Sequence, residues 1–203
     1  ILTWVIRMTV VDKNVEYRPL LMIIGRKVCT HEIPLDPAYQ YVAYQPAFEA
    51  EWAQLQYDLG AFDTLDKAQQ TIHEMASKPM FKENFLFVCD QNGHLVGSAG
   101  LWPGHHYGME RLRIHYVAVS QAHQHHKIGS SMVSKLIMKY DATPGKYPLY
   151  LATQTNSYGA IAMYSHLGFT PYLGAYDGCT KKQSEANWTL ATEILREKNS
   201  SYN

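Results

Sequence analysis

The stretch from Arg111 to Tyr140 constrains the fold of this 203-residue chain more than any other part of the sequence. Residues Arg111–Ser120 form an alternating, largely apolar run typical of a strand, and Gln121–Lys127 is polar. From Ile128 the apolar residues recur at helical spacing, so the predicted order is strand, loop and helix. The amides of a helix's first turn have no acceptor within the helix, and the helix dipole adds positive character there. The loop and helix therefore predict a site for a phosphate or pyrophosphate.

A second strand and helix follow in the same order. Pro148–Thr155 predicts a strand, Ser157–Leu167 a helix, and Gly168 suits the left-handed residue that ends a helix before a further strand over Thr170–Leu173. Because a helix from about Gln124 to Tyr140 separates the first strand from the second, the two strands are expected to be parallel neighbours. The predicted class is therefore mixed α/β.

The preceding part of the chain predicts two helices and a hairpin. An Asn-Gly pair between two apolar runs is a strong hairpin signal, and Asn92-Gly93 supplies one. Asp63 is expected to cap the second helix and Pro79 to end it. The predicted elements are a strand over Tyr39–Tyr44, helices over Pro46–Gly60 and Thr64–Ser77, and strands over Phe85–Asp90 and His94–Leu101.

The first 38 residues predict a β-hairpin extension to a single domain over 39–203. Ile1–Val11 and Val15–Ile24 are strand-like, and Pro19 favours an edge position for the second strand. An exposed hairpin could pair with a second copy, so a homodimer is considered.

The C-terminal end is expected to add little to the fold. Asn187–Thr192 alternates weakly and predicts a last strand, and the charged segment Glu193–Asn203 is expected to fray.

Charge and cysteine content exclude several classes of protein. Lys+Arg and Asp+Glu number 18 each, so no broad electrostatic field favours nucleic acid or an anionic membrane as a partner. The apolar start is too short for a spanning helix, which needs roughly 20 residues. Three scattered cysteines, Cys29, Cys89 and Cys179, favour a reducing compartment, so we expect a cytoplasmic protein.

Two motifs lie within the strand–helix units. Val117-Ala118-Val119 precedes Gln124-His125-His126-Lys127-Ile128-Gly129, and Asn156, Ala160 and Tyr164 precede Gly168-Phe169. Together they resemble the GNAT superfamily of acyl-CoA-dependent N-acetyltransferases. Lys127 departs from the pattern, because it stands where the family's first glycine usually lies. The resemblance covers roughly Phe85 to Tyr172.

The resemblance implies a fold and an acyl donor. The implied fold is a single mixed, largely antiparallel sheet with a splayed central pair of parallel strands, flanked by helices. The implied donor is acetyl-CoA, with strand amides on the pantetheine, loop amides on the pyrophosphate and Asn156 positioning the cofactor arm. The implied cofactor-binding residues are Val117, Ala118, Val119, Gln124, His125, His126, Lys127, Ile128, Gly129, Ser130 and Asn156.

Acyl transfer to an amine needs a base for the amine and an acid for the departing thiolate. Tyr164 matches the tyrosine that many family members use as the acid; alternatively, it packs on the helix face while its hydroxyl binds the CoA sulfur or water. His115 has the strand parity of Val117 and Val119 and titrates near neutrality, so it is the first candidate for the base. Glu110 is the second candidate, and a purely structural role for His115 or a water chain as base are the alternatives.

An aromatic, glycine-rich connection over residues 102–108 leads into the first strand and is a candidate substrate wall. Its candidate substrate-binding residues are Trp102, His105, His106 and Tyr107. The alternative is an ordinary long turn with Trp102 packed inward. The histidines here and in the loop lack the spacing of a tetrahedral metal site, so no metal is expected.

The sequence thus predicts an acyltransferase that moves an acetyl group from acetyl-CoA directly to a primary amine of a small molecule or peptide in a ternary complex. The alternative is a non-catalytic acyl-CoA-binding sensor or assembly module on the same fold.

Overall fold

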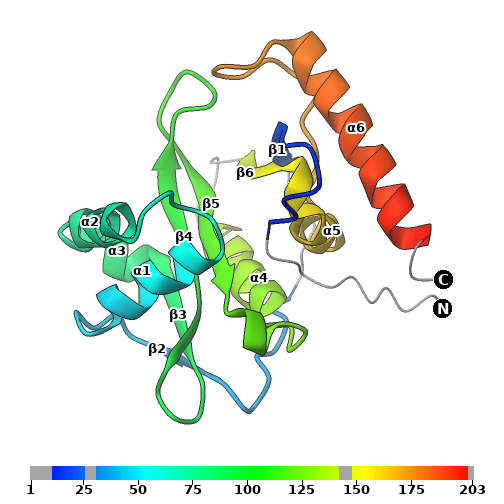
Figure 1. Cartoon of the computed structure of the whole chain (residues 1–203). Coiled ribbons are helices and arrows are strands. Elements are labelled where there is room, and N and C mark those ends of the chain that lie inside the picture. The colour runs from blue at the N-terminus through cyan, green and yellow to red at the C-terminus, as the bar shows by residue number, and fades with distance from the viewer. Residues whose placement is uncertain (1–10, 26–30, 142–147, 201–203) are drawn as a thin grey trace. The chain divides into compact units, whose positions relative to one another are not determined.

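The computed structural model describes residues 11–25, 31–141 and 148–200 (Figure 1). Helices and strands occur in both of the compact units into which the chain divides, and the predicted mixed α/β class is confirmed. Unit 1 comprises Ile1–Val28, Pro103–Arg113 and Pro144–Asn203, and unit 2 comprises Cys29–Trp102 and Ile114–Thr143.

Antiparallel strands form the centre of unit 2. Val42 lies opposite Phe87, and Phe87 lies opposite Ser98. The hairpin predicted around Asn92-Gly93 is confirmed, and Gly93 takes the left-handed φ of +85° that a tight turn requires. The strands, of which the last two continue into unit 1, are β2 (Gln40–Val42), β3 (Phe85–Cys89), β4 (Leu95–Gly104) and β5 (Arg111–Val119).

The helices of unit 2 begin and end close to the predicted positions, with one correction. Thr64, not Asp63, caps the second helix, because its side chain accepts the Lys67 N–H. The second helix ends at Ala76, before Pro79 as predicted, and Pro79 also starts a further short helix, since proline needs no N–H in a first turn. The helices are α1 (Phe48–Asp58), α2 (Leu65–Ala76), α3 (Pro79–Asn84) and α4 (Ile128–Asp141), with a short 3-10 turn, η1 (Gln121–His123), before α4.

Two packing contacts hold the helices of unit 2 to its strands. Trp52 and Ile72 are fully buried in one hydrophobic cluster with the rings of Phe81 and Phe87. Helix α4 approaches β4 at Gly97, where an added Cβ would lie 3.1 Å from the Ile128 side chain. Burial of such large side chains is the main stabilising contribution to this unit.

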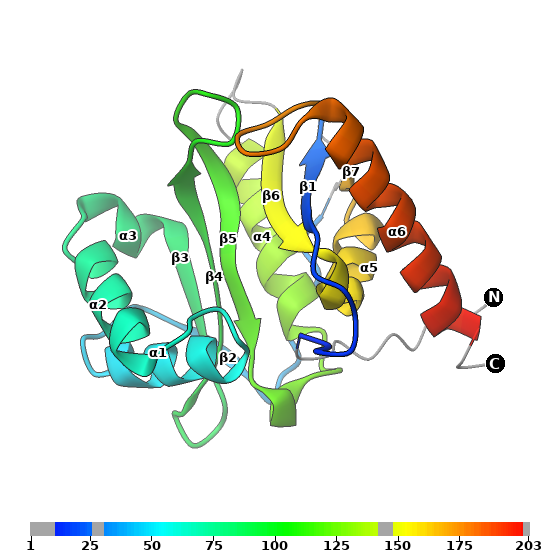
Figure 2. The same cartoon turned by 45° about the horizontal axis from the view of Figure 1, so that its top comes forward.

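Unit 1 is built around β1. This strand was predicted at an edge, and that prediction is wrong, because β1 pairs with a strand on each side. Met22 pairs with Leu151 on one side and with Pro171 on the other, both antiparallel (Figure 2). Pro19 is tolerated because it is the first residue of the strand. The other predicted arm of the hairpin lies largely outside the described residues. The strands are β1 (Pro19–Ile24), β6 (Leu149–Gln154) and β7 (Thr170–Pro171).

The predicted last strand is wrong, because residues 181–200 form one helix. Its buried positions recur every three or four residues, as Ser184, Asn187, Ala191 and Ile194 show, which is helical spacing. The fraying predicted from Glu193 onward is wrong for residues 193–200, which continue the helix, and its last three residues lie outside the described part of the chain. The helices of unit 1 are α5 (Tyr158–His166), after the 3-10 turn η2 (Thr155–Ser157), and α6 (Lys181–Ser200).

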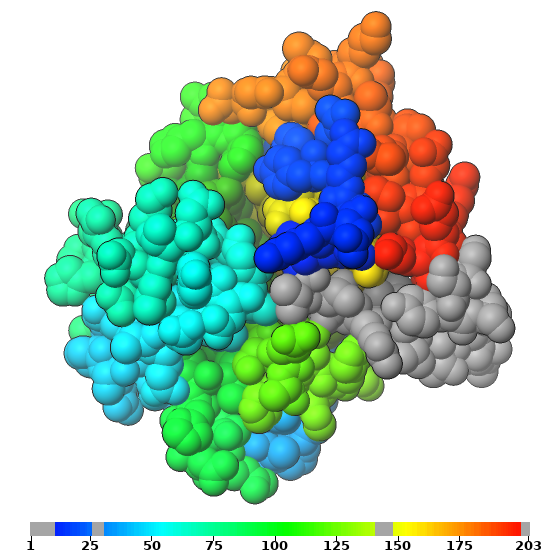
Figure 3. Space-filling view, in the orientation of Figure 1, coloured from blue at the N-terminus to red at the C-terminus, as the bar shows by residue number. Residues whose placement is uncertain are grey.

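Helix α6 is anchored near its end. The Lys198 ammonium lies 3.0 Å from the Asp12 carboxylate, and the two segments lie side by side on the surface (Figure 3). This ammonium lowers the pKa of Asp12. Within the described part of the chain, no helix has the length and apolar character needed to cross a bilayer. The parallel pairing predicted for β5 and β6 involves both units and stays a prediction.

Candidate functional site

The regular alternation of β5 is interrupted at Tyr116, which has a left-handed φ of +50°. Its carbonyl accepts hydrogen bonds from Gln56 Nε2 at 3.1 Å and from Ser98 Oγ at 3.3 Å. Its ring lies 5.2 Å from the ring of Trp52 and stacks on Phe62 at 5.8 Å. The buried amide and the aromatic cluster thus offset the unfavourable conformation.

The interruption removes the parity argument for His115. Alternation of side chains between the two faces of a strand requires regular extended backbone at each residue. Tyr116 breaks that regularity between His115 and Val117, so a shared face for His115, Val117 and Val119 no longer follows from spacing. The role of His115 as a base stays a prediction.

Two residues of the loop before α4 have left-handed backbone, and one of them is Lys127, which stands where the motif has its first glycine. Lys127 has a φ of +60° and His125 a φ of +71°, both in the left-handed region that glycine occupies at little cost. The Lys127 carbonyl accepts the Ser131 N–H at 2.8 Å, which is the first hydrogen bond of the helix. The amides of Ile128, Gly129 and Ser130 precede that bond and have no acceptor within the helix.

The candidate cofactor residues of unit 2 differ in exposure. Gln124 is half-buried, and its side-chain amide lies 3.4 Å from the Val119 carbonyl, which ties the loop to the end of β5. Ala118, Val119, Ile128 and Gly129 are buried, Val117 and Ser130 are half-buried, and His125, His126 and Lys127 are exposed. The exposed side chains leave the loop open to a ligand.

A segment that was not predicted to belong to the site, around Asp36 and Tyr39, holds this loop from one side. The Tyr39 hydroxyl lies 3.1 Å from His123 Nδ1, and the Tyr39 ring meets the His126 ring edge-on at 5.4 Å. The Asp36 carboxylate accepts the Ala38 N–H and lies 3.3 Å from His126 Nδ1. Both contacts lower the pKa of Asp36, and the hydrogen bond from Ala38 contributes more. The sequence signal that could have pointed to this segment was the turn at Asp36-Pro37, close to the aromatic Tyr39.

The predicted site residues Asn156 and Tyr164 belong to unit 1. Asn156 is buried, and within the described residues its side-chain oxygen has no hydrogen-bond partner. Tyr164 lies on α5 beside Phe169, and burial raises the pKa of its hydroxyl. A buried acceptor without a partner is costly, so Asn156 is suited to receive a hydrogen bond from a ligand. The left-handed end of α5 predicted at Gly168 is confirmed, with a φ of +95°.

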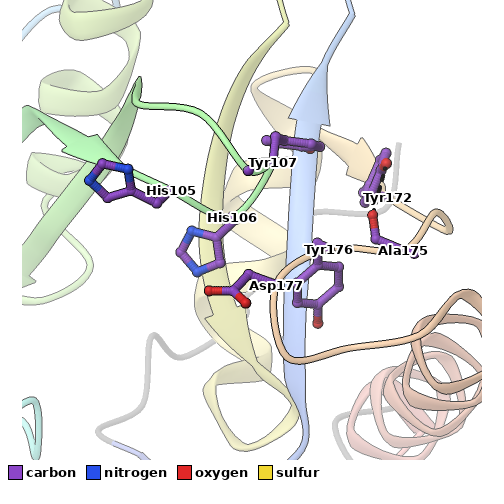
Figure 4. Close-up of a pocket in the computed structure, with 8 residues that line it drawn as sticks. His105, His106, Tyr107, Tyr172, Ala175, Tyr176 and Asp177 are labelled. Atoms are coloured by element: carbon purple, nitrogen blue, oxygen red, sulfur yellow. Dashed lines mark hydrogen bonds between the residues drawn. The ribbon is translucent and has the colours of Figure 1, made fainter.

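The connection between β4 and β5 forms one wall of a cavity in unit 1 of about 720 Å³ (Figure 4). The opposite wall is the turn after β7, and the Asp177 N–H donates to the His106 carbonyl at 2.9 Å to join the two walls. The lining residues are His105, His106, Tyr107, Gly108, Tyr172, Ala175, Tyr176 and Asp177.

The structure brings three of the four predicted substrate-wall residues to this cavity. Trp102 is not among them; it packs against Phe81 and Phe85, the inward position given above as the alternative. Glu110 is exposed, with its carboxylate 3.9 Å from His105 Nε2. The sequence prediction missed the turn after β7, for which the closely spaced tyrosines at 172 and 176 were the available signal.

Metal ligands do not gather in the described ranges: no group of three His, Cys, Asp or Glu side chains there could hold an ion.

Comparisons with known proteins give a consistent picture. The family model described as "Acetyltransferase (GNAT) family" matches residues 41–169. Among solved structures, a GCN5-related N-acetyltransferase from Sphaerobacter thermophilus is 17% identical with a TM-score of 0.54, over 77% of this chain and 50% of that one. A GNAT-family acetyltransferase from Colwellia psychrerythraea is 13% identical with a TM-score of 0.55, over 77% and 54%. The chain thus spans about half the length of these two structures.

An aminoglycoside N-acetyltransferase in complex with CoA is 12% identical with a TM-score of 0.53, over 68% of this chain and 91% of that one. At such low identities these likenesses show the fold alone. No curated protein matches the chain.

Proposed function

This chain belongs to the GNAT acetyltransferase family, and we propose that it transfers an acetyl group from acetyl-CoA directly to a primary amine. The family itself implies acyl-CoA-dependent acetyl transfer. The direct route through a ternary complex and the nature of the amine are the proposal.

The conformation of Lys127 is the observation that carries this proposal. Lys127 has a left-handed φ at the position of the motif's first glycine, which supports a loop path that presents the first-turn amides of α4 to the diphosphate. Its ammonium adds a local positive charge to a chain of zero net charge. In this proposal the residues of the loop, from Gln124 to Ser130, bind the diphosphate.

The rest of the donor is assigned to strand backbone and to one amide side chain. The backbone of Val117, Ala118 and Val119 is proposed to pair with the pantetheine arm, and an amide aimed at the thioester oxygen would stabilise the charge that develops there. The unpartnered side-chain oxygen of Asn156 fits an N–H of the same arm.

The transfer step needs a base that accepts a proton from the amine and an acid that donates a proton to the departing thiolate. The lone pair of the neutral amine forms a bond to the thioester carbon, the carbon–sulfur bond breaks, and the thiolate takes a proton. Tyr164 is proposed as the acid, because burial keeps its hydroxyl protonated at neutral pH. The proton of the amine goes to a base, for which His115 and Glu110 are the candidates.

The cavity of unit 1 is the proposed site of the acceptor, which is a small molecule or a peptide amine. Its volume is in the range of small-molecule sites. His105, His106 and Tyr107 are the proposed substrate-binding residues from the sequence.

We infer a reducing compartment, such as the cytoplasm, for this reaction. Cys89 and Cys179 are free thiols that are both buried. Free cysteines of this kind are typical of reducing compartments.

Release of CoA thiol from acetyl-CoA across a panel of amines tests the proposal. We expect amine-dependent release, and Gly129→Glu should abolish it together with CoA binding, because a carboxylate would stand at the diphosphate. Tight CoA binding without release on any amine would instead support the non-catalytic acyl-CoA-binding module. Unchanged CoA affinity in Gly129→Glu would show that the diphosphate binds elsewhere.

A further inference from the structure

The geometry of the unit 1 cavity points to a substrate class: we propose that it binds a second, non-reacting ammonium group of the acceptor, so that the preferred substrates are small diamines or polyamines. This inference rests on the proposed function, since it concerns the acceptor of that reaction.

Aromatic rings supply most of the cavity wall. The Tyr107 ring meets the Tyr172 ring edge-on, with centres 5.1 Å apart, and the Tyr172 and Tyr176 rings lie 6.4 Å apart. The His106 ring lies 6.3 Å from Tyr176. These rings come from two segments of the chain that face each other in Figure 4. Tyrosine faces attract cations, and rings fixed by one another form a surface that needs little ordering when a ligand binds.

The charges at the cavity also favour a cation. Asp177, in the turn after β7, lines it as an exposed residue, and the Glu110 carboxylate, in the connection between β4 and β5, lies 3.9 Å from His105 Nε2. Burial, and then the nearby Arg113, lower the pKa of His106, so that this imidazole is neutral at pH 7. The Arg113 side chain packs over Gly104 and is not part of the lining.

The size of the cavity indicates a small ligand. A volume of about 720 Å³ accommodates a small organic molecule. An aliphatic chain can lie against tyrosine rings while the ammonium at its end stays near the carboxylate.

The ammonium at Asp177 is not the nitrogen that reacts. A carboxylate beside an ammonium raises the pKa of the amine and so holds its proton. The reacting amine must lose that proton before it attacks the thioester. The two requirements conflict on one nitrogen, and a molecule with two nitrogens joined by a spacer satisfies both.

Three acceptors of matched length test this inference: 1,6-diaminohexane, hexylamine and 6-aminohexan-1-ol. We expect the KM of the diamine to be about 3- to 10-fold below the other two, the range for one exposed ion pair aided by ring contacts. Asp177→Asn should raise the KM of the diamine to that of hexylamine. The matched control is Asp63→Asn, which removes an exposed carboxylate of unit 2, 91% exposed, and should keep the preference.

A pair of variants at Tyr176 tests the ring separately. Its hydroxyl donates to the Pro19 carbonyl at 3.1 Å, and both Tyr176→Phe and Tyr176→Leu lose that bond. Only Tyr176→Leu also loses the aromatic face. We expect the KM of the diamine to rise more in Tyr176→Leu than in Tyr176→Phe, and equal values in the two variants would contradict a cation–ring contact.

The outcomes separate this inference from the proposed function. Turnover of all three amines with equal KM values, or an unaltered diamine preference in Asp177→Asn, overturns the diamine assignment and leaves acetyl transfer standing. If no amine is acetylated, the proposed function fails. Calorimetric titration of 1,6-diaminohexane into the wild type and into Asp177→Asn then still shows whether the cavity binds a cation. Weaker binding to the variant supports the cation site, and equal or absent binding to both refutes it.

Discussion

The imidazole of His115 lies against the phenol ring of Tyr116, with ring centres 3.7 Å apart and planes inclined by 36°. Consecutive side chains of a regular strand point to opposite faces and cannot make such a contact. The left-handed φ of Tyr116 brings the two rings together, and it changes the direction of the backbone immediately before Val117. The conformation of β5 at this point therefore determines where the next amides are presented.

The buried side chain of Gln56 is expected to support this conformation. Gln56→Leu removes the hydrogen bond to the Tyr116 carbonyl and should lower the free energy of unfolding by about 1–2 kcal/mol, measured by urea denaturation. It should also lower kcat/KM, because the Val117 amide follows directly. Gln54→Leu, on the exposed side of the same helix, is the matched control. Equal effects of the two substitutions would show that Gln56 does not support the strand.

Lys127 is expected to combine a conformational cost with a favourable charge. Lys127→Gly removes the steric cost of a side chain on left-handed backbone. The free energy of unfolding should rise by about 0.5–1 kcal/mol, after the extra entropy of glycine in the unfolded chain is subtracted. Lys127→Ala keeps the cost and should not stabilise the protein. Both substitutions remove the ammonium, so both should raise the KM for acetyl-CoA by about 2- to 5-fold. A stabilised Lys127→Ala variant would contradict this explanation.

Tyr39 is expected to be a positioning residue for the loop before α4. Tyr39→Phe removes the contact of the hydroxyl with His123 and keeps the ring, and the KM for acetyl-CoA should rise by about 2- to 5-fold, the effect of one hydrogen bond. The KM for the amine should stay unchanged, which a general loss of stability would not produce. Tyr17→Phe, at a tyrosine that is 60% exposed, serves as the control. A rise in both KM values would exclude a specific role in positioning the loop.

Tyr164→Phe tests the proposed acid. We expect kcat to fall by about 10- to 1000-fold while CoA affinity, measured by calorimetry, changes little. Because burial raises the pKa of the hydroxyl, it stays protonated up to and beyond its ordinary value of about 10, and loss of this proton should not limit kcat at lower pH. An unchanged kcat in Tyr164→Phe would remove the residue from the acid role.

Prediction from local sequence patterns was correct where those patterns are strong. The hairpin at Asn92-Gly93 and the left-handed end of α5 at Gly168 follow from residues within a few positions of each turn. It failed at residues 187–192, where weak alternation favoured a strand and burial of Trp188 and Ala191 on one side of α6 produced a helix. Burial against distant segments overrides local preference when the local signal is weak.

The sequence alone determined the order of strand, loop and helix that ends at α4, and it carries the two motifs that resemble the GNAT family, because such signals extend over only a few residues. Only the tertiary structure showed that β1 is paired on both edges, that Lys127 keeps a glycine conformation, and that Asp177 joins the aromatic loop before β5. Each of these features depends on contacts between residues far apart in the chain. Spacing along the sequence carries no information about such contacts.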